Sequence, residues 1–207
     1  MITPLDNTIR GVMEFTWPMI VICILTLSSI RITDIIKNKK EFVLYKEIFT
    51  LLFLIYIMCL FQIVTFEDQT IYITGNNLVP FKEIMRYQIG SRLFIKNVIG
   101  NIVLFIPYGI FVSLFAKLDK LFHSLGLVMF ASVIVETTQL LIGRVFDIDD
   151  IILNIIGGLI GYGIYRLMDR IGDSLPKVFK RTWFLNIITI LLVIVFVGYI
   201  WMVMVVE

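Results

Sequence analysis

The sequence predicts an all-α, polytopic integral membrane protein, a helical bundle of about six transmembrane helices with an interfacial helix in its long outer loop. Hydrophobic residues make up 59% of the 207-residue chain and charged residues only 16%. In soluble domains, roughly 45–50% of residues are apolar and about 25% are charged. The mean hydropathy is +0.95. Nucleic acid is not expected as a partner, because no basic stripe is interleaved with aromatic residues.

The apolar residues fall into segments long enough to cross a bilayer as helices, which takes about 20 residues. Pro18 and Pro107 lie inside such segments, and Pro107 is expected to bend its helix. The first segment is expected to remain as an anchor, because no basic region precedes it and no small-residue cleavage site follows it. Polar or charged breaks separate the predicted spans, which are residues 13–33, 47–66, 97–116, 124–142, 151–168 and 183–205.

Basic residues indicate the orientation, because Lys and Arg are enriched in cytoplasmic loops. The breaks after the first, third and fifth spans must share one side, and they hold 12 of the 18 basic residues. This side is expected to be cytoplasmic, which places both termini outside. The opposite side also carries four basic residues in the long loop: Lys82, Arg86, Arg92 and Lys96.

That long outer loop, residues 67–96, contains the turn signals Asn76, Asn77 and Pro80. From Phe81 onward, apolar residues recur at helical spacing as far as Phe94. This pattern predicts a helix that either lies in the membrane interface or packs over the outer end of the bundle.

Polar residues gather where three predicted helices meet the outer face. Ionisable residues at the edge of a bilayer are costly, which suggests a functional purpose. Neighbouring antiparallel helices joined by a short loop must have their ends close together, so residues on the third, fourth and fifth spans should converge. The members are Asn97, Asn101, Glu136, Gln139, Arg144, Asp147, Asp149, Asp150 and Asn154.

Several of these residues have a purely structural alternative. Asp149 or Asp150 could cap its own helix. Arg144 could be an interfacial anchor, and Asn97 and Asn101 could simply join helices.

Glu136 is harder to explain structurally, because it lies about 9 Å below the outer end of its helix at 1.5 Å per residue. A carboxylate there needs a partner, a proton or a water-filled cavity. On the next span, Gly157 and Gly161 are four residues apart and predict close helix packing, with Gly158 beside them.

The residues leave three chemical possibilities open. Carboxylates and amides could hold a hard cation such as Ca²⁺ or Mg²⁺. Glu136 and an aspartate could act as acid and base. Arg144 could bind a phosphate or carboxylate while the acidic residues bind amines or hydroxyls. Covalent catalysis is the least favoured chemistry, because the sequence shows no arrangement of residues that would activate a nucleophile. Among the function classes, a transporter ranks third after a binding protein and an enzyme, because no polar residues lead from this face to the cytoplasmic side.

The chain resembles the VanZ-like family of bacterial membrane proteins. The resemblance covers about residues 50–168 and rests on NNLVPF at 76–81, NVIGNIVLFIPYG at 97–109, and ETTQLLIGRVFDIDDIILNIIGGLIGY at 136–162. It implies a role in resistance to glycopeptide and lipoglycopeptide antibiotics, teicoplanin above all. The signature positions that it implies are Asn101, Pro107, Gly109, Glu136, Gln139, Gly143, Arg144, Asp147, Asp150, Asn154 and Gly157.

Residues and resemblance together predict a single membrane domain over 1–207, with a VanZ-like core at about 50–168 and extra flanking helices at 13–33 and 183–205. The expected function is antibiotic resistance or envelope homeostasis in the bacterial cytoplasmic membrane, through an outward-facing polar pocket. The pocket would bind an envelope lipid, a lipid-linked wall intermediate or the lipoglycopeptide, and no cofactor or metal is expected. The predicted binding residues are Asn97, Asn101, Glu136, Gln139, Arg144, Asp147, Asp150 and Asn154.

The alternative function is a membrane enzyme that acts on an envelope lipid or a phosphate polymer. Its acid and base would come from Glu136, Asp147 and Asp150. The sequence does not decide whether a reaction is catalysed.

Overall fold

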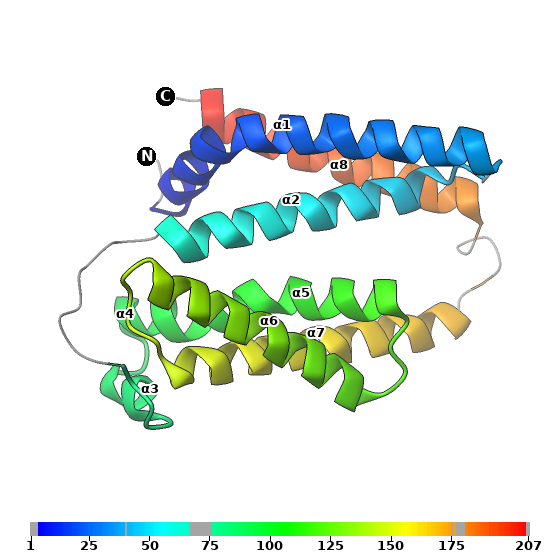
Figure 1. Ribbon diagram of the computed structural model, residues 1–207. Helices are drawn as coiled ribbons and strands as arrows, with labels where there is room; N and C mark the ends of the chain where they lie inside the picture. Colours follow the sequence, from blue (N-terminus) through cyan, green and yellow to red (C-terminus); the bar gives the residue numbers. More distant parts are fainter. Residues whose placement is uncertain (1–3, 40, 67–75, 175, 177–180, 206–207) are drawn as a thin grey trace. The chain divides into compact units, whose positions relative to one another are not determined.

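The computed structural model describes residues 4–39, 41–66, 76–174, 176 and 181–205, and these are helical almost throughout (Figure 1). The described part contains no strand, which confirms the predicted all-α class. The long helices are α1 (Pro4–Asn38), α2 (Leu44–Phe66), α5 (Gly100–Ala116), α6 (Leu121–Leu141), α7 (Ile148–Ser174) and α8 (Thr182–Val205). Short elements precede α5, namely α3 (Lys82–Arg86), α4 (Arg92–Phe94) and a π-helical turn, η1 (Ile95–Ile99).

Helices long and apolar enough to cross a membrane account for the first five predicted spans. Within the described residues they are Trp17–Asn38, Leu44–Ile63, Arg92–Ala116, Leu121–Leu141 and Ile148–Gly172. The sixth predicted span coincides with α8, whose described apolar part is Thr182–Val195, and its crossing stays a prediction. The chain is therefore a helical, multi-pass membrane protein.

The chain divides into two compact units. The first unit combines Met1–Ile63 with Leu175–Glu207, and the second is Val64–Ser174. The prediction of a single membrane domain over the whole chain stays a prediction. In the first unit, the Arg31 guanidinium donates to both carboxylate oxygens of Glu47 at 2.9–3.0 Å. The Tyr45 backbone N–H donates to Asn186 Oδ1 at 3.1 Å, which joins the start of α2 to α8.

In the second unit, α5 and α7 run in the same direction and pack backbone to backbone. A Cβ on Gly157 would lie 2.1 Å from the Ile102 carbonyl oxygen, and one on Gly161 would lie 2.2 Å from the Ile106 oxygen. Side chains at these glycines would overlap the neighbouring helix. The close packing predicted from Gly157 and Gly161 is confirmed, and it positions the first turn of α7 against α5.

The third helix, α6, packs against this pair where Gly158 faces Val128. A Cβ on Gly158 would lie 2.4 Å from Val128 Cγ1, and a Cβ on Gly109 of α5 would lie 2.1 Å from the Gly158 carbonyl oxygen. Val128 is fully buried. The three helices therefore meet closely at mid-length, and their ends carry the polar residues.

The helix predicted from Phe81 to Phe94 is interrupted, which corrects the extent of the expected interfacial helix. Helix α3 ends at Arg86, and the chain then turns through Gly90, whose φ of +81° lies in the left-handed region. Ser91 accepts a hydrogen bond from the Phe94 N–H at 3.1 Å and begins the next helix. The helical periodicity thus belongs to two elements, and its last residues open the third span.

Candidate functional site

The N-terminus of α7 is organised around Asp147, which is its N-cap. Asp147 Oδ1 accepts from the Asp149 backbone N–H at 2.8 Å and from Asn77 Nδ2 at 2.8 Å. The first bond satisfies one of the N–H groups that a helix start leaves open. Burial raises the pKa of the Asp147 carboxyl above its usual range, although both hydrogen bonds oppose the shift.

Asn77 is buried and holds the long loop against the loop that precedes α7. Its backbone N–H donates to the Phe146 carbonyl at 2.9 Å, and its own carbonyl accepts from the Ile148 N–H at 3.1 Å. The Phe146 N–H donates in turn to Asn76 Oδ1 at 3.3 Å. Asn77 and Asp147 therefore form an isolated parallel β-bridge, and the Asn76–Asn77 pair fixes two loops that are remote in sequence.

Asp149 caps α3 rather than its own helix. Its carboxylate accepts from the backbone N–H groups of Phe81 at 2.5 Å, Glu83 at 2.7 Å and Ile84 at 3.2 Å. Phe81, the N-cap residue of α3, has a left-handed φ of 66° and offers no side-chain cap. The sequence prediction of a capping aspartate at α7 is realised by Asp147 instead, and Asp149 is structural.

Glu136 lies on α6 beneath this loop and is 1% exposed. Its Oε2 accepts from the Asp147 backbone N–H at 3.1 Å. The positive charge of Arg144 acts on both Glu136 and Asp150. Gly143 adopts a φ of +88°, and this left-handed turn ends α6 directly before Arg144.

The same end of the unit receives a side chain from α5, where Asn101 Nδ2 donates to Asp150 Oδ1 at 2.6 Å. One turn deeper on α7, Asn154 Nδ2 donates to Ser132 Oγ of α6 at 3.1 Å, and both residues are buried. Residues on α5, α6 and α7 are thus brought together as predicted. We call Asn101, Glu136, Arg144, Asp147 and Asp150 the polar cluster.

The remaining predicted residues have different surroundings. Gln139 is buried on α6, and its backbone carbonyl accepts from the Arg144 N–H at 2.9 Å. Asn97 lies half-buried in η1, and the hydrogen bonds described for the polar cluster do not include its side chain. Sequence reasoning missed Asn77 and Ser132 as partners of cluster residues. The paired asparagines at 76–77 were a usable signal, whereas Ser132 offered none.

Buried serines extend the polar face of α6 away from the cluster. Ser124, Val128, Ser132 and Glu136 follow one another at four-residue intervals and are all buried. Ser124 Oγ lies 3.3 Å from Ser113 Oγ of α5. The sequence suggested no row of polar residues from the cluster toward the opposite end of the helices. The structure shows an incomplete row of buried polar residues on α6, which apolar Val128 interrupts.

The cluster and its surroundings are rich in carboxyl groups, namely those of Glu136, Asp147, Asp149 and Asp150, and the positive charge of Arg144 acts on two of them, Glu136 and Asp150. Acidic oxygens accept from amines and hydroxyls, whereas a guanidinium binds a carboxylate or phosphate. Within the described part of the chain, no three His, Cys, Asp or Glu side chains are grouped as metal ligands.

The fold and this site define a multi-pass helical membrane protein with a polar cluster at one end of a three-helix unit. Over residues 48–169 the chain matches the VanZ/LLP1 family, and it belongs to that family. The match covers the residues on which the resemblance was based. No curated protein and no solved structure matches the chain.

Proposed function

We propose that the polar cluster is a binding site for the polar part of an envelope lipid, a lipid-linked wall intermediate or a lipoglycopeptide. In this proposal the protein contributes to teicoplanin-type resistance or envelope homeostasis in the bacterial cytoplasmic membrane. The observation that carries it is the convergence of α5, α6 and α7 on hydrogen-bonded carboxylates and amides. Asn101 contacts Asp150 at 2.6 Å, and Glu136 accepts from Asp147 at 3.1 Å.

The exposure of the cluster divides its members into two roles. Asn101, Arg144, Asp147 and Asp150 are half-buried and can reach a ligand, whereas Glu136 is buried beneath them. We therefore assign ligand contact to the first four. Glu136 accepts from the Asp147 backbone N–H and so holds that residue in place from below the site.

The ligand chemistry follows from this arrangement. Asp147 and Asp150 suit amines and hydroxyls, and Arg144 suits an acidic group, so a ligand that carries both kinds of group fits best. Leu141, three residues before Arg144, is an exposed apolar side chain, and so are Leu78 and Val79, which directly follow Asn77, the partner of Asp147. They offer surface to an acyl or polyprenyl chain, which is why a lipid-bearing ligand is favoured over a free sugar or peptide.

The outward orientation of the cluster is part of the proposal. Lys117, Lys120, Arg166 and Arg170 lie at the ends of α5, α6 and α7 opposite to the cluster. The enrichment of Lys and Arg in cytoplasmic loops favours that end as the inner one. A ligand arriving from the cell envelope would then reach the cluster directly.

Susceptibility of cells tests this function. A sensitive bacterial host would express the wild type, Glu136→Ala, which removes the acceptor of the Asp147 N–H, Arg144→Gln, or the control Arg86→Gln, which removes an exposed cation from α3. We expect the wild type and the control to raise the inhibitory concentration of teicoplanin more than that of vancomycin. Both cluster variants should lose the effect at equal membrane abundance, and full resistance in both would overturn the site assignment.

A specific observation also supports the competing enzyme. Buried Glu136 lies one hydrogen bond from the backbone of half-buried Asp147, and two carboxyls in different environments can serve as acid and base. Glu136→Gln keeps an acceptor for the Asp147 N–H and removes the ionisable group. Turnover of a labelled envelope lipid by purified wild type, abolished in this variant, would establish the enzyme; saturable binding without turnover would favour the binding site.

A further inference from the structure

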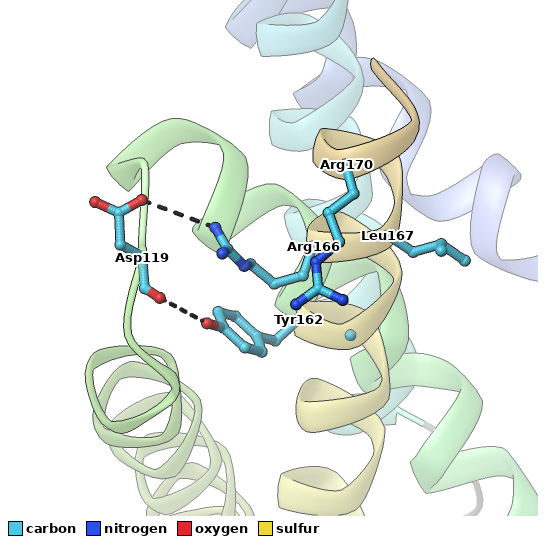
Figure 2. Close-up of a pocket in the computed structure, with 6 residues that line it drawn as sticks. Asp119, Tyr162, Arg166, Leu167 and Arg170 are labelled. Atoms are coloured by element: carbon cyan, nitrogen blue, oxygen red, sulfur yellow. Dashed lines mark hydrogen bonds and ion pairs between the residues drawn. The ribbon is translucent and has the colours of Figure 1, made fainter. Parts of the chain in front are cut away.

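A second polar site lies at the other end of the α5–α7 unit. A pocket of about 490 Å³ opens between the α5–α6 loop and the C-terminal half of α7 (Figure 2). Arg166 and Asp150 are 16 residues apart on one helix, which separates the two sites by about 24 Å at 1.5 Å per residue. The pocket is lined by Asp119, Tyr162, Gly163, Arg166, Leu167 and Arg170.

The pocket places two guanidinium groups on one face of a helix. Tyr162, Arg166 and Arg170 are spaced four residues apart, so their side chains leave α7 on the same side. The Tyr162 hydroxyl donates to the Asp119 backbone carbonyl at 3.0 Å, which ties the α5–α6 loop to α7. Figure 2 shows Arg166 extended toward the Asp119 carboxylate and Arg170 folded back along the helix toward Tyr162.

The contacts of Arg166 within the described residues are loose. Its Nη1 lies 3.9 Å from Asp119 Oδ1 and 3.4 Å from Asp169 Oδ2. The Asp119 side chain is 88% exposed, and ion pairs with exposed partners contribute little. An anion with two or three oxygens could therefore replace these carboxylates at Arg166 with little loss.

The surroundings favour a lipid as the source of that anion. The site is near the end of a helix that is long and apolar enough to cross a membrane. Leu167 within the pocket and Phe122 at the start of α6 are 57% and 78% exposed. Lys117 and Lys120 lie in the loop that carries Asp119. Basic pockets between membrane helices bind anionic headgroups in this way, with guanidinium groups on the phosphate and acyl chains along the apolar surface.

We propose that Arg166 and Arg170 bind the phosphate of an anionic phospholipid headgroup in this pocket, where the hydrogen bond from Tyr162 to the Asp119 carbonyl holds the loop against α7. Arg166 takes the phosphate oxygens in place of its carboxylate contacts. Arg170 supplies the second positive charge, and the acyl chains lie along Leu167. The site is separate from the polar cluster and does not depend on the function proposed for it.

Lipid binding to the purified full-length protein in detergent tests the site, with native mass spectrometry as the readout. Phosphatidylglycerol and phosphatidylcholine with identical acyl chains are compared on the wild type, Arg166→Gln, Arg170→Gln and the double variant. We expect phosphatidylglycerol affinity to fall about fivefold in each single variant and about thirtyfold in the double variant, from the typical contribution of one basic side chain near a membrane surface. Phosphatidylcholine binding should not change.

Two further variants make the test specific. Arg86→Gln removes an exposed cation elsewhere in the same unit and should leave phosphatidylglycerol affinity unchanged. Asp119→Asn keeps the backbone carbonyl that Tyr162 requires and removes the competing charge, so it should strengthen binding. If the double variant does not fold, Arg166→Lys with Arg170→Lys keeps the charge and should retain binding weakened severalfold.

Unchanged phosphatidylglycerol affinity in the double variant would overturn the proposal, as would an equal loss for phosphatidylcholine. Glycerol phosphate serves as the source control, because it carries the phosphate without acyl chains. If it binds the wild type as tightly as phosphatidylglycerol does, the pocket takes a free phosphate and the lipid assignment is wrong.

Discussion

Replacing Asp149 with alanine should release α3 from the start of α7. The carboxylate is 1% exposed and accepts from three backbone N–H groups at 2.5, 2.7 and 3.2 Å. Hydrogen bonds to a charged group each contribute about 1.5–3 kcal/mol. Because the three bonds share one carboxylate, their contributions do not add fully, and we expect the net cost of removing all three to be that of one to two such bonds, about 2–4 kcal/mol.

Hydrogen exchange measures this cost locally. At about 1.4 kcal/mol per tenfold change, protection of the amides of residues 81–86 should fall about 30-fold to 1,000-fold in Asp149→Ala. In Asp149→Asn, which keeps one acceptor oxygen, the protection of these amides should fall less. Asp169→Ala alters a half-exposed aspartate on the same helix and should leave this segment unchanged. Equal protection in Asp149→Ala and the wild type would refute the cross-helix cap.

The remaining predictions concern packing and titration. Gly157→Ala should destabilise the protein by about 1–3 kcal/mol, because its Cβ would overlap the α5 backbone; Gly163→Ala, which meets nothing within 4 Å, is the matched control in thermal unfolding. Ser132→Ala should cost about 1–3 kcal/mol, since buried Asn154 loses its acceptor, and a Tm equal to that of the wild type would contradict this. Asp147→Asn keeps a side chain that can cap α7, and its stability relative to the wild type should increase as pH rises.

The sign of the Asp147 effect follows from its raised pKa. A carboxyl whose pKa is higher in the folded state favours folding below its ordinary pKa of about 3.9, and this contribution is lost as pH rises through the raised value. The amide of the variant does not titrate. The difference in Tm, variant minus wild type, should therefore increase from about pH 4 toward neutrality, and a pH-independent difference would contradict the assignment.

Much of the fold could be predicted because its cause is local. Runs of apolar residues determine which segments cross a membrane, and the Gly157–Gly161 spacing indicated close packing without knowledge of the partner helix. The loop helix was predicted too long because apolar periodicity continued through Gly90 and Ser91. Their local conformations, a left-handed turn and an N-cap, interrupt a pattern that periodicity alone cannot divide.

The convergence of the candidate site was predictable from topology, because neighbouring helix ends must meet. Its internal connections were not. Asp147 and Asp149 are both aspartates beside the same helix start, yet one caps α7 and the other caps α3. Which carboxylate faces which element depends on how residues 76–86 return to the bundle. That path is a tertiary property with no local pattern in the sequence.

Direct binding to the purified protein tests the central claim that the polar cluster is a ligand site. Labelled teicoplanin and a labelled lipid-linked wall precursor would be titrated against the wild type, Arg144→Gln, Glu136→Gln and the control Arg86→Gln in detergent. We expect saturable binding of at least one ligand by the wild type and the control. We also expect affinity to be lower by about tenfold or more in Arg144→Gln, as for loss of a charge-assisted pair. Equal affinity in all four proteins, or no saturable binding by the wild type, would contradict the claim.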